Sequence, residues 1–350
     1  MTTISTEQAQ WFRDTFQAMV ANVERAVLGK SHVIELCLTA MVSEGHVLLE
    51  DFPGTGKTSL ARAISQSMQG TATRIQFTPD LLPGDVTGIT VYDQKSGEFA
   101  FHPGPVFANV VLADEINRAS AKTQSALLEV MEEGRVTVDA VSRPVGVPFL
   151  VIATQNPIEQ AGTYRLPEAQ LDRFMVKTSI GYPDRAATLQ ILAATAEAQQ
   201  ELGPVVTPEV VVGMADIARS VYVNPLLLDY IARIVEASRT ATQVRMGASV
   251  RAARALTKAA KTWAAAHGRI FVTPDDVQLL AGPVLAHRLV LDAEAEFDGV
   301  TAEAVIAQIL LDTVPPTRND TARSETAGSD TAGGDKARVE AAGVETDAVT

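Results

Sequence analysis

The spacing of hydrophobic positions changes near Pro183. Before that residue, short apolar runs suited to buried strands alternate with helical patterns. The runs are HVLLE (46–50), TRIQF (73–77), NVVLADE (109–115), FLVIAT (149–154) and MVKTSI (175–180). Strands of this kind, separated by helices, predict an α/β domain in which both faces of a parallel sheet are covered.

After Pro183, apolar residues recur at three- and four-residue intervals, which is typical of amphipathic helices. The expected helices are 184–201, 208–221, 225–240, 248–267 and 274–290. Thr207-Pro208 and Thr273-Pro274 resemble helix starts, with threonine as the cap and proline at the first position. A smaller, all-helical domain is therefore predicted to follow the α/β domain.

Two stretches interrupt the α/β alternation with hairpin patterns. Residues 88–106 contain two alternating runs around Lys95-Ser96-Gly97, and residues 132–149 contain a second pair whose first arm is 135–138. A turn-rich segment between alternating runs favours a β-hairpin. Taken alone, both hairpins could be structural decoration.

The C-terminal segment 314–350 has no aromatic residue and almost no large aliphatic one, and it repeats short "TA" units. It cannot bury enough apolar surface to offset the entropy lost on ordering, so we expect a disordered tail. The predicted organisation is an α/β domain at 1–182, a helical domain at 183–312 and a tail at 313–350.

Composition narrows the functional classes. The net charge of −13 disfavours broad binding of nucleic acid. Cys37 is the single cysteine and the five histidines show no ligand spacing, so no metal site of that type is expected. The first ten residues lack the features of a signal peptide, and no run approaches about 18 apolar residues, so we expect a cytoplasmic protein without a membrane span.

The stretch HVLLEDFPGTGKTSLA (46–61) nearly matches the phosphate-binding pattern G-x-x-x-x-G-K-[ST]. Lys57 is expected to contact the β- and γ-phosphates of a nucleotide, and Thr58 to bind Mg²⁺. The alternative is a glycine-rich turn with a chance GKT. The residues expected to bind the nucleotide here are Pro53, Gly54, Thr55, Gly56, Lys57, Thr58 and Ser59.

Asp51 replaces the first glycine of that pattern. A carboxylate that pointed toward the phosphates would weaken their binding. We therefore predict that Asp51 faces away from them and caps nearby backbone N–H groups.

Polar residues also end two other predicted strands. Asp114 is expected to hold Mg²⁺ through water, and Glu115 to polarise an attacking water. Asn156 follows the strand 149–154 and would lie beside Asp114 if the two strands are neighbours, where it could orient that water or sense the γ-phosphate. The alternatives are solvated acids at a strand end and an Asn-Pro turn.

Five motifs together carry a family resemblance: GKT (56–58), LADEINRA (112–119), ATQNP (153–157), LPEAQLDRF (166–174) and GASVRA (247–252). In this order and spacing they resemble the MoxR family of AAA+ ATPases, over about residues 10–311. The resemblance implies a P-loop domain with β-hairpin inserts and a helical lid. In related ring ATPases, such as the magnesium-chelatase motor subunit and the MCM helicases, these inserts face the pore or the substrate.

The resemblance also implies roles for three arginines. Arg173 matches the arginine finger that reaches the γ-phosphate in a neighbouring subunit; a salt bridge to Glu168 or Asp172 is the structural alternative. Arg251 matches the sensor-2 arginine of the lid, in a motif that usually has proline where this chain has valine. Arg118 is typical of the family, and we expect it at a subunit interface.

The adenine side of the site is less well marked. Leu28 and Gly29 lie where the family has a stretch that lines the adenine pocket. Lys30 replaces the usual glutamine there, and a turn between helices explains the same residues.

The implied function is ATP hydrolysis, with ATP and Mg²⁺ as ligands, by a homo-oligomeric ring that is expected to be a hexamer. Family resemblance further implies chaperone-like activation of partner proteins, often proteins with von Willebrand factor A domains. The alternatives are the motor subunit of a metal chelatase, a nucleic-acid translocase, and a scaffold that binds ATP without hydrolysing it. The acidic balance and the scarcity of basic residues in the first hairpin disfavour the translocase.

Overall fold

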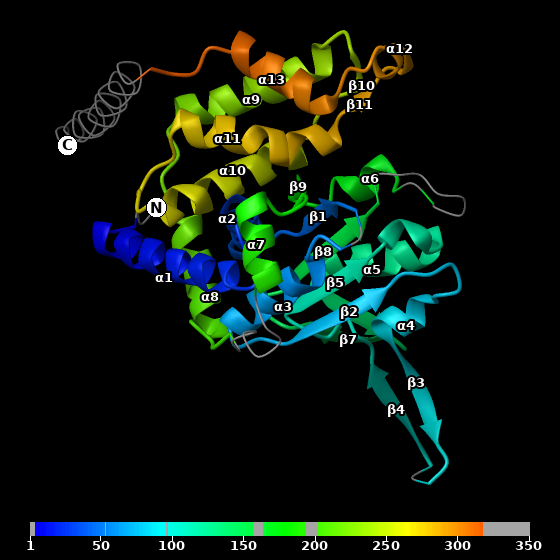
Figure 1. Cartoon of the computed structure of the whole chain (residues 1–350). Coiled ribbons are helices and arrows are strands. Elements are labelled where there is room, and N and C mark those ends of the chain that lie inside the picture. The colour runs from blue at the N-terminus through cyan, green and yellow to red at the C-terminus, as the bar shows by residue number, and fades with distance from the viewer. Residues whose placement is uncertain are drawn as a thin grey trace, which may run out of the picture.

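The computed structural model describes residues 4–52, 54–95, 97–156, 164, 166–193 and 202–317. A parallel sheet with flanking helices forms one part, a helical lid lies against it, and a long hairpin projects away from both (Figure 1). The predicted fold class is confirmed. The boundary at residue 183 stays a prediction.

All five predicted strands form, and they build one parallel sheet in the order β2-β5-β8-β1-β9. The strands are β1 (Val47–Glu50), β2 (Ala72–Gln76), β5 (Val110–Asp114), β8 (Leu150–Gln155) and β9 (Val176–Thr178). Because all of them run the same way, their carboxyl ends meet at one edge of the sheet. Ligands bind at that edge in open α/β sheets.

Alternate side chains of the strands enter two separate cores, since successive residues of a strand point to opposite faces. Val47, Leu49 and Ile152 pack in the core with α1 (Thr6–Glu24), α2 (Ser31–Val42) and α3 (Lys57–Ser67). The opposite face packs with α4 and α5; its residues from the parallel sheet are Leu48, Ile75, Val111, Ala113, Val151 and Ala153. The bounds of these helices are α4 (Pro83–Thr87) and α5 (Ala121–Glu133).

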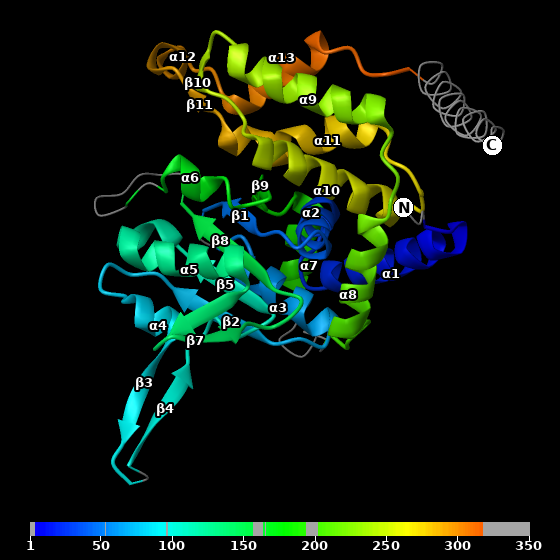
Figure 2. The same ribbon diagram turned by 180° about the vertical axis from the view of Figure 1, so that it is seen from behind.

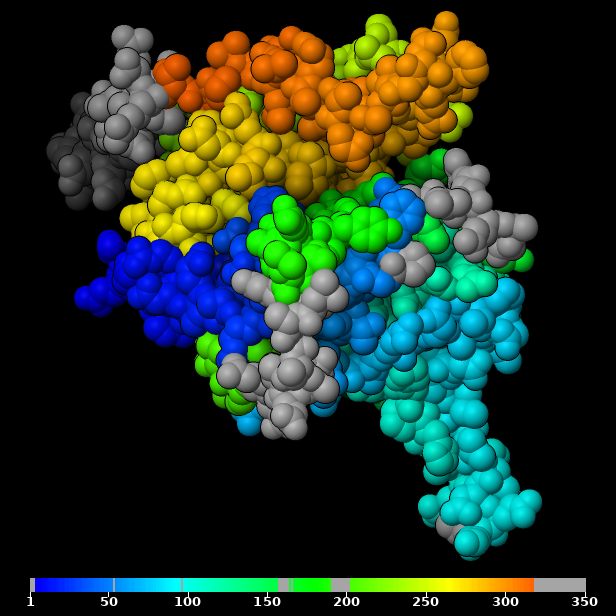
Figure 3. Space-filling view, in the orientation of Figure 1, coloured from blue at the N-terminus to red at the C-terminus, as the bar shows by residue number. Residues whose placement is uncertain are grey.

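Both predicted hairpins form. The first is β3 (Gly88–Asp93) with β4 (Glu98–Pro103), and the second is β6 (Arg135–Val138) with β7 (Val141–Pro144). The β3–β4 hairpin extends far beyond the rest of the molecule, as the space-filling view shows (Figure 3). It therefore exposes both of its faces to solvent or to a partner.

Four of the predicted helices form in the lid, and two further features were not predicted: a helix at 302–312 and a small sheet. Its longer helices are α8 (Pro208–Arg219), α9 (Pro225–Thr240), α10 (Val250–Ala266), α11 (Pro274–Leu285) and α13 (Ala302–Asp312). The prediction of an all-helical domain is wrong in one detail, because β10 (Val244–Met246) and β11 (Val290–Leu291) form a small antiparallel sheet. Strands of three and two residues are too short to show an alternating pattern.

Smaller elements complete the described chain: η1 (Ile116–Arg118), α6 (Glu168–Leu171), α7 (Arg185–Ala193), η3 (Ala286–Arg288) and α12 (Ala293–Phe297). Residues 194–201 of the predicted helix 184–201, and the predicted tail from residue 318 onward, lie outside the described residues. In the part of the chain that is described, every helix is too short or too polar to cross a lipid bilayer.

The predicted helix starts are correct in position, but the predicted threonine cap does not form at α8. α8 and α11 begin at Pro208 and Pro274, and the side chain of Thr207 makes no capping hydrogen bond. At α11 the Asp276 carboxylate accepts a hydrogen bond from the backbone N–H of Thr273 (2.8 Å). The same carboxylate pairs with Arg269, so an ion pair fixes this helix start.

His46 lies buried just before β1 and makes the fold sensitive to acid. Its Nδ1 accepts a hydrogen bond from the N–H of Val151 (3.1 Å), and its Nε2 donates to the carbonyl of Met131 (3.0 Å). Burial lowers the pKa of His46 from 6.5 to about 4. The neutral imidazole thus satisfies both contacts, whereas a protonated Nδ1 would face a backbone donor.

Because the folded-state pKa of His46 is depressed, the unfolded chain binds more protons between pH 6.5 and pH 4. We expect the free energy of unfolding to be highest above pH 6.5 and to fall by about 3 kcal/mol toward pH 4 from this group alone. Urea titrations at several pH values would measure this loss. His46→Asn should flatten the profile, whereas the control His102→Asn, in the exposed hairpin, should not; equal profiles for both variants would contradict the assignment.

Candidate functional site

The phosphate-loop sequence connects β1 to α3, as its pattern requires. Gly54 and Gly56 have φ values of +84° and +92°, a conformation that favours glycine. Gly56 caps α3, which begins at Lys57, and Thr58 and Ser59 are exposed in its first turn. The unpaired N–H groups at this helix start could bind an anionic phosphate. Thr55 is buried, and Pro53 lies outside the described residues.

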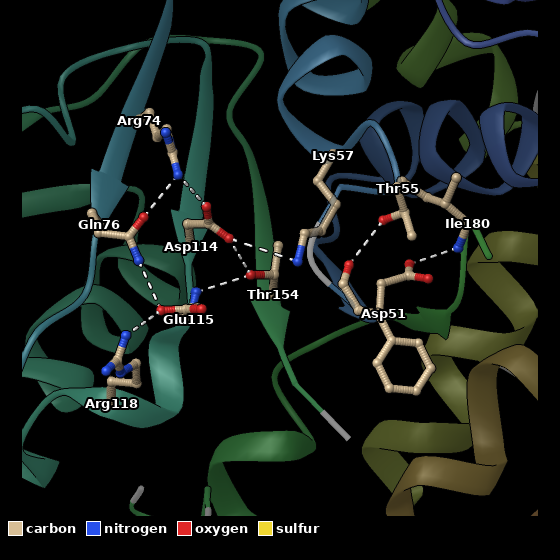
Figure 4. A network of polar contacts seen from close by, with 11 residues as sticks. Asp51, Thr55, Lys57, Arg74, Gln76, Asp114, Glu115, Arg118, Thr154 and Ile180 are labelled. Carbon is tan, nitrogen blue, oxygen red and sulfur yellow. Dashed lines mark hydrogen bonds and ion pairs between the residues drawn. The ribbon is translucent and has the colours of Figure 1, made fainter. Parts of the chain in front are cut away.

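Asp114 lies opposite Lys57 at the carboxyl edge of the sheet (Figure 4). Lys57 Nζ is 3.9 Å from Asp114 Oδ1, and both side chains are nearly buried. Thr154 donates its hydroxyl to the same oxygen (2.6 Å), while Arg74 Nη2 lies 2.6 Å from Asp114 Oδ2. A buried carboxylate surrounded by two cations and a hydroxyl is well suited to a site for phosphate and a divalent cation.

Glu115 adopts a left-handed backbone conformation, with a φ of +56°. Such a conformation costs a non-glycine residue on the order of 1–3 kcal/mol, and it is found most often at functional sites. The N–H of Glu115 donates to Thr154 Oγ1 (2.9 Å), which holds the strained residue against β8. Its carboxylate accepts from Gln76 Nε2 (3.0 Å) and Arg118 Nη1 (2.8 Å), as Figure 4 shows.

Asn156 follows β8, and β8 pairs with β5, so the predicted adjacency of these two strands is confirmed. It therefore lies at the same edge of the sheet as Asp114. Arg118 donates a hydrogen bond to Glu115 of its own chain, and its expected position at a subunit interface stays a prediction.

The predicted orientation of Asp51 is confirmed. Its carboxylate accepts hydrogen bonds from the N–H groups of Ile180 (2.7 Å) and Gly181 (2.8 Å) and from the hydroxyl of Ser179 (2.9 Å). Only 2% of the residue is exposed. Asp51, which replaces the first glycine of the pattern, thus connects the start of the phosphate loop to the segment after β9 through three hydrogen bonds.

Leu28 and Gly29 lie near that same segment. The Lys30 ammonium donates to the carbonyl of Tyr182 (2.8 Å), and a side chain added at Gly29 would meet Ala187 at 3.8 Å. Tyr182 in turn stacks on Phe52 of the phosphate loop, with ring centroids 6.2 Å apart. These contacts bring the predicted adenine side and the phosphate side of the site together.

Arg173 and Arg251 lie together, but away from this group. Both contact Glu132 at the end of α5, Arg173 at 3.1 Å and Arg251 at 2.5 Å. The expected alternative, a salt bridge from Arg173 to Glu168 or Asp172, is wrong because Glu132 is the partner. No pattern in the sequence pointed to Glu132.

The position of Arg173 in the sheet explains this separation. It precedes β9, and Met175 pairs with His46, the residue before β1, so Arg173 lies at the amino edge of the sheet. Lys57 follows the carboxyl edge of β1. A strand rises about 3.3 Å per residue, so the four residues of β1 alone separate the two edges by roughly 13 Å. Arg173 therefore cannot share a phosphate with the Lys57 of its own chain.

A buried ion pair connects the arginine segment to the lid. Arg288 Nε lies 2.8 Å from Asp172 Oδ1, and Arg288 also donates to the carbonyls of Asp172 (3.1 Å) and Phe174 (2.8 Å). Burial lowers the pKa of Arg288 to about 10, so the group stays charged at neutral pH. Ser249, before α10, adds a hydrogen bond to Asp172 (3.2 Å).

Mg²⁺ prefers oxygen ligands, several of which are usually water and substrate phosphates. Thr58 follows Lys57 at the exposed start of α3, and the Asp114 carboxylate lies 3.9 Å from Lys57 Nζ, so both residues offer such oxygens near Lys57. In the described ranges, no group of three or more His, Cys, Asp or Glu side chains could hold a metal by itself. The residues thus fit a cation that is bound together with a nucleotide.

Comparison with known proteins agrees with these features. A family model described as "ATPase family associated with various cellular activities (AAA)" matches residues 46–176, and a model of the AAA lid domain matches residues 236–309. YeaC, an uncharacterized protein of Bacillus subtilis, is 47% identical over 83% of this chain and 92% of its own length. Chaperone MoxR1 of Mycobacterium tuberculosis is 40% identical over 87% of this chain and 83% of its own.

A crystal structure of a protein from Cytophaga hutchinsonii has the same fold. It superposes with a TM-score of 0.82 at 38% identity, over 89% of this chain and 98% of that protein. The fold, the lid and the relatives agree with the motifs of the phosphate loop and of the strand that ends in Asp114 and Glu115. The chain therefore belongs to the MoxR family of AAA+ ATPases.

Proposed function

We propose that this protein is an ATP-hydrolysing ring motor that remodels or activates partner proteins. One observation carries the proposal: the residues suited to ATP are divided between two opposite edges of the sheet. Lys57, Asp114 and Glu115 lie at the carboxyl edge, and Arg173 and Arg251 lie at the amino edge. A complete site then needs two copies arranged head to tail, and repetition of that contact closes a ring, for which we propose six subunits.

In this mechanism, the helix start at α3 and Lys57 bind the phosphates, while Leu28 and Gly29 lie at the adenine. Mg²⁺, held by Thr58 and by Asp114 through water, would neutralise charge on the phosphates.

Glu115 would orient the water that attacks the γ-phosphate, with Asn156 beside it. Gln76 and Arg118 donate hydrogen bonds to the Glu115 carboxylate, so they would position it for that water.

Arg173 and Arg251 would stabilise the charge of the transferring phosphoryl group in the neighbouring subunit. Their shared partner, Glu132, has a side chain that is 40% exposed, so phosphate oxygens can replace it at little cost. Under this proposal Arg251 acts between subunits, because it contacts α5 beside Arg173 and not the phosphate loop of its own chain.

ATP turnover by the purified chain should require Mg²⁺. Because Lys57 alone cannot neutralise the phosphates, EDTA should stop phosphate release and added Mg²⁺ should restore it. A phosphate-release assay measures this directly. Equal turnover with EDTA would contradict the metal role, and no turnover with Mg²⁺ would favour the non-hydrolysing scaffold.

The exposed hairpin is the proposed contact for a client polypeptide. Phe99 is 75% exposed and packs against Tyr92, which is 51% exposed, at a centroid distance of 5.2 Å. Val91 and Ile89 add exposed apolar surface on the same strand pair. An apolar surface on a projecting hairpin favours a protein client over a nucleic acid, which would require basic residues.

Phe99→Ser should weaken binding of an unfolded, leucine-rich model polypeptide about tenfold, because an aromatic anchor is lost. Basal ATP turnover should stay the same, since the hairpin is remote from Lys57. Titration of the polypeptide against ATPase rate would measure both quantities. Lys95→Ser is the matched control on the same hairpin; if it has the same effect, the apolar contact is not responsible.

The client itself stays a proposal. MoxR1 is named a chaperone, and the family resemblance favours a partner with a von Willebrand factor A domain. A porphyrin-dependent partner assay would separate this from a chelatase motor.

A further inference from the structure

The lid contains an open, largely apolar groove that the proposed ATP site does not use. It has a volume of about 460 Å³ and lies between α8, α9, α10 and the end of α2. Its apolar lining includes Val42, Ala218, Leu228, Ile231 and Ala253. Leu228 is 45% exposed, so the groove is accessible from solvent. An engineered cavity of about 150 Å³ is enough to bind benzene, so this groove can take an aromatic side chain.

Cations from one face of α10 border the groove. Arg254, Lys258 and Lys261 follow one another at four- and three-residue spacing and therefore lie on one side of the helix. Lys261 is occupied, because its ammonium donates to the carbonyl of Arg219 (2.8 Å). Arg254 and Lys258 are exposed and have no side-chain ion pair or hydrogen bond within the described residues. Unpaired cations are notable in a chain whose net charge is −13.

The opposite chemistry occurs on α12, a short helix of the same lid. Phe297 is 92% exposed, while Ala295 in the same helix is buried and packs it onto the lid. Glu294, Glu296 and Asp298 surround Phe297 in the sequence and are exposed. Like Arg254 and Lys258, these acids have no ion pair in the part of the chain that the structure covers. We refer to residues 294–298 as the acidic knob.

The knob and the groove lie far apart on one molecule. In Figure 1, α12 is at the upper right, whereas α8, one of the four helices that line the groove, is left of centre at mid-height; Figure 2, seen from behind, shows the same separation. A chain therefore cannot place its own knob in its own groove. Two different complementary surfaces at separate places are what a head-to-tail contact between copies requires.

We propose that the acidic knob of one subunit docks in the lid groove of the next copy of this chain. Phe297 would enter the apolar groove, and Glu294 and Glu296 would pair with Lys258 and Arg254. This contact rests on the proposed ring and deepens it, because it adds a lid-to-lid interface to the contact at the nucleotide. The lids would then hold neighbouring subunits together whichever nucleotide is bound.

A charge-reversal experiment on the full chain tests the proposal. One double variant carries Arg254→Glu and Lys258→Glu, and the other carries Glu294→Lys and Glu296→Lys. In each, knob and groove have the same sign of charge, so the dissociation constant for self-assembly should rise at least about tenfold. In an equal mixture the two double variants can alternate around the ring. Each contact then joins a knob and a groove of opposite charge, so assembly should recover. Sedimentation velocity with ATP and Mg²⁺ measures all three samples.

Matched controls are Lys122→Glu on α5 and Glu303→Lys on α13, which change charge outside the knob and groove and should assemble like the original chain. Phe297→Ser should weaken assembly like the double variants. The proposal is overturned if the double variants assemble normally, or if their mixture shows no recovery. It is also overturned if Phe297→Ser assembles normally but loses stimulation by a polypeptide client, because the acidic knob would then contact a partner protein and not a second copy of this chain.

Failure of this inference is distinguishable from failure of the proposed function. The ring motor is wrong if the original chain releases no phosphate from ATP. The docking contact is wrong if the original chain is active and the reversed variants assemble normally. ATP binding by each double variant, followed with a fluorescent ATP analogue, should match the original chain, because no altered residue touches the phosphate loop.

Discussion

Replacement of Glu115 by glutamine should leave ATP binding intact and lower ATP turnover by about a hundredfold to ten-thousandfold. The amide has nearly the same shape as the carboxylate, so the left-handed backbone and the bond to Thr154 are retained. The amide cannot accept a proton from the attacking water, and it lacks the negative charge that would polarise this water. Lys57, which in the proposed mechanism binds the phosphates, is unchanged, so affinity for ATP should stay within about twofold.

Phosphate release and binding of a fluorescent ATP analogue measure the two effects separately. Glu133→Gln, an exposed carboxylate at the end of α5, is the control and should keep normal turnover. Normal turnover in Glu115→Gln would remove Glu115 from the mechanism. The same variant with ATP should retain a client, so affinity capture with it would also identify the partner.

The second large effect is expected from Arg173→Ala and Arg251→Ala, each of which should abolish most turnover in a ring of identical subunits. Loss of an arginine that stabilises the transferring phosphate in a neighbouring site costs about 10³-fold or more. Nucleotide affinity of the isolated subunit should change little. Thermal stability should also change little, because both arginines pair with the half-exposed Glu132.

Mixing experiments distinguish action between subunits from action within one. An Arg173→Ala subunit has an intact Glu115, and a Glu115→Gln subunit has an intact Arg173. If Arg173 acts on its neighbour, an equal mixture should recover roughly a quarter of normal turnover, because half of the sites have Glu115 and half of those have an intact neighbour. The same arithmetic applies to Arg251→Ala.

No recovery in the Arg251 mixture would place Arg251 in the site of its own chain. Arg13→Ala, on the exposed face of α1, is the matched control and should be fully active alone. Unfolding of Arg173→Ala at room temperature would instead show that this arginine is structural.

Much of the site could be predicted from the sequence because its residues follow strands. Asp114, Glu115 and Asn156 come at the ends of apolar runs, and Lys57 follows the short loop after another such run. Parallel strands bring these ends to one edge of the sheet. The role of Asp51 also followed from local chemistry, since a carboxylate near phosphates must turn away from them.

Other residues could not be predicted, because their contacts depend on the tertiary arrangement. Glu132 becomes a partner of Arg173 and Arg251 only when α5, the segment before β9 and the lid converge. The sequence gives a partial indication that Arg74 belongs to the site. Arg74 and Gln76 are polar residues on one face of β2, where they interrupt an apolar pattern. Thr154 is a polar residue in the buried strand β8, which also hints at a role in the site. Its partner, Asp114, becomes apparent only from the pairing of β8 with β5.

The buried pair of Arg288 and Asp172 gives the proposed ring a direction. This pair joins the lid to the segment that carries Arg173. In the proposed ring, Arg173 would reach the nucleotide of the adjacent copy. Each lid would therefore follow its neighbour's ATP more closely than its own. Hydrolysis at one interface would change the shape of the next subunit, and a cycle of turnover would progress around the ring in a single sense.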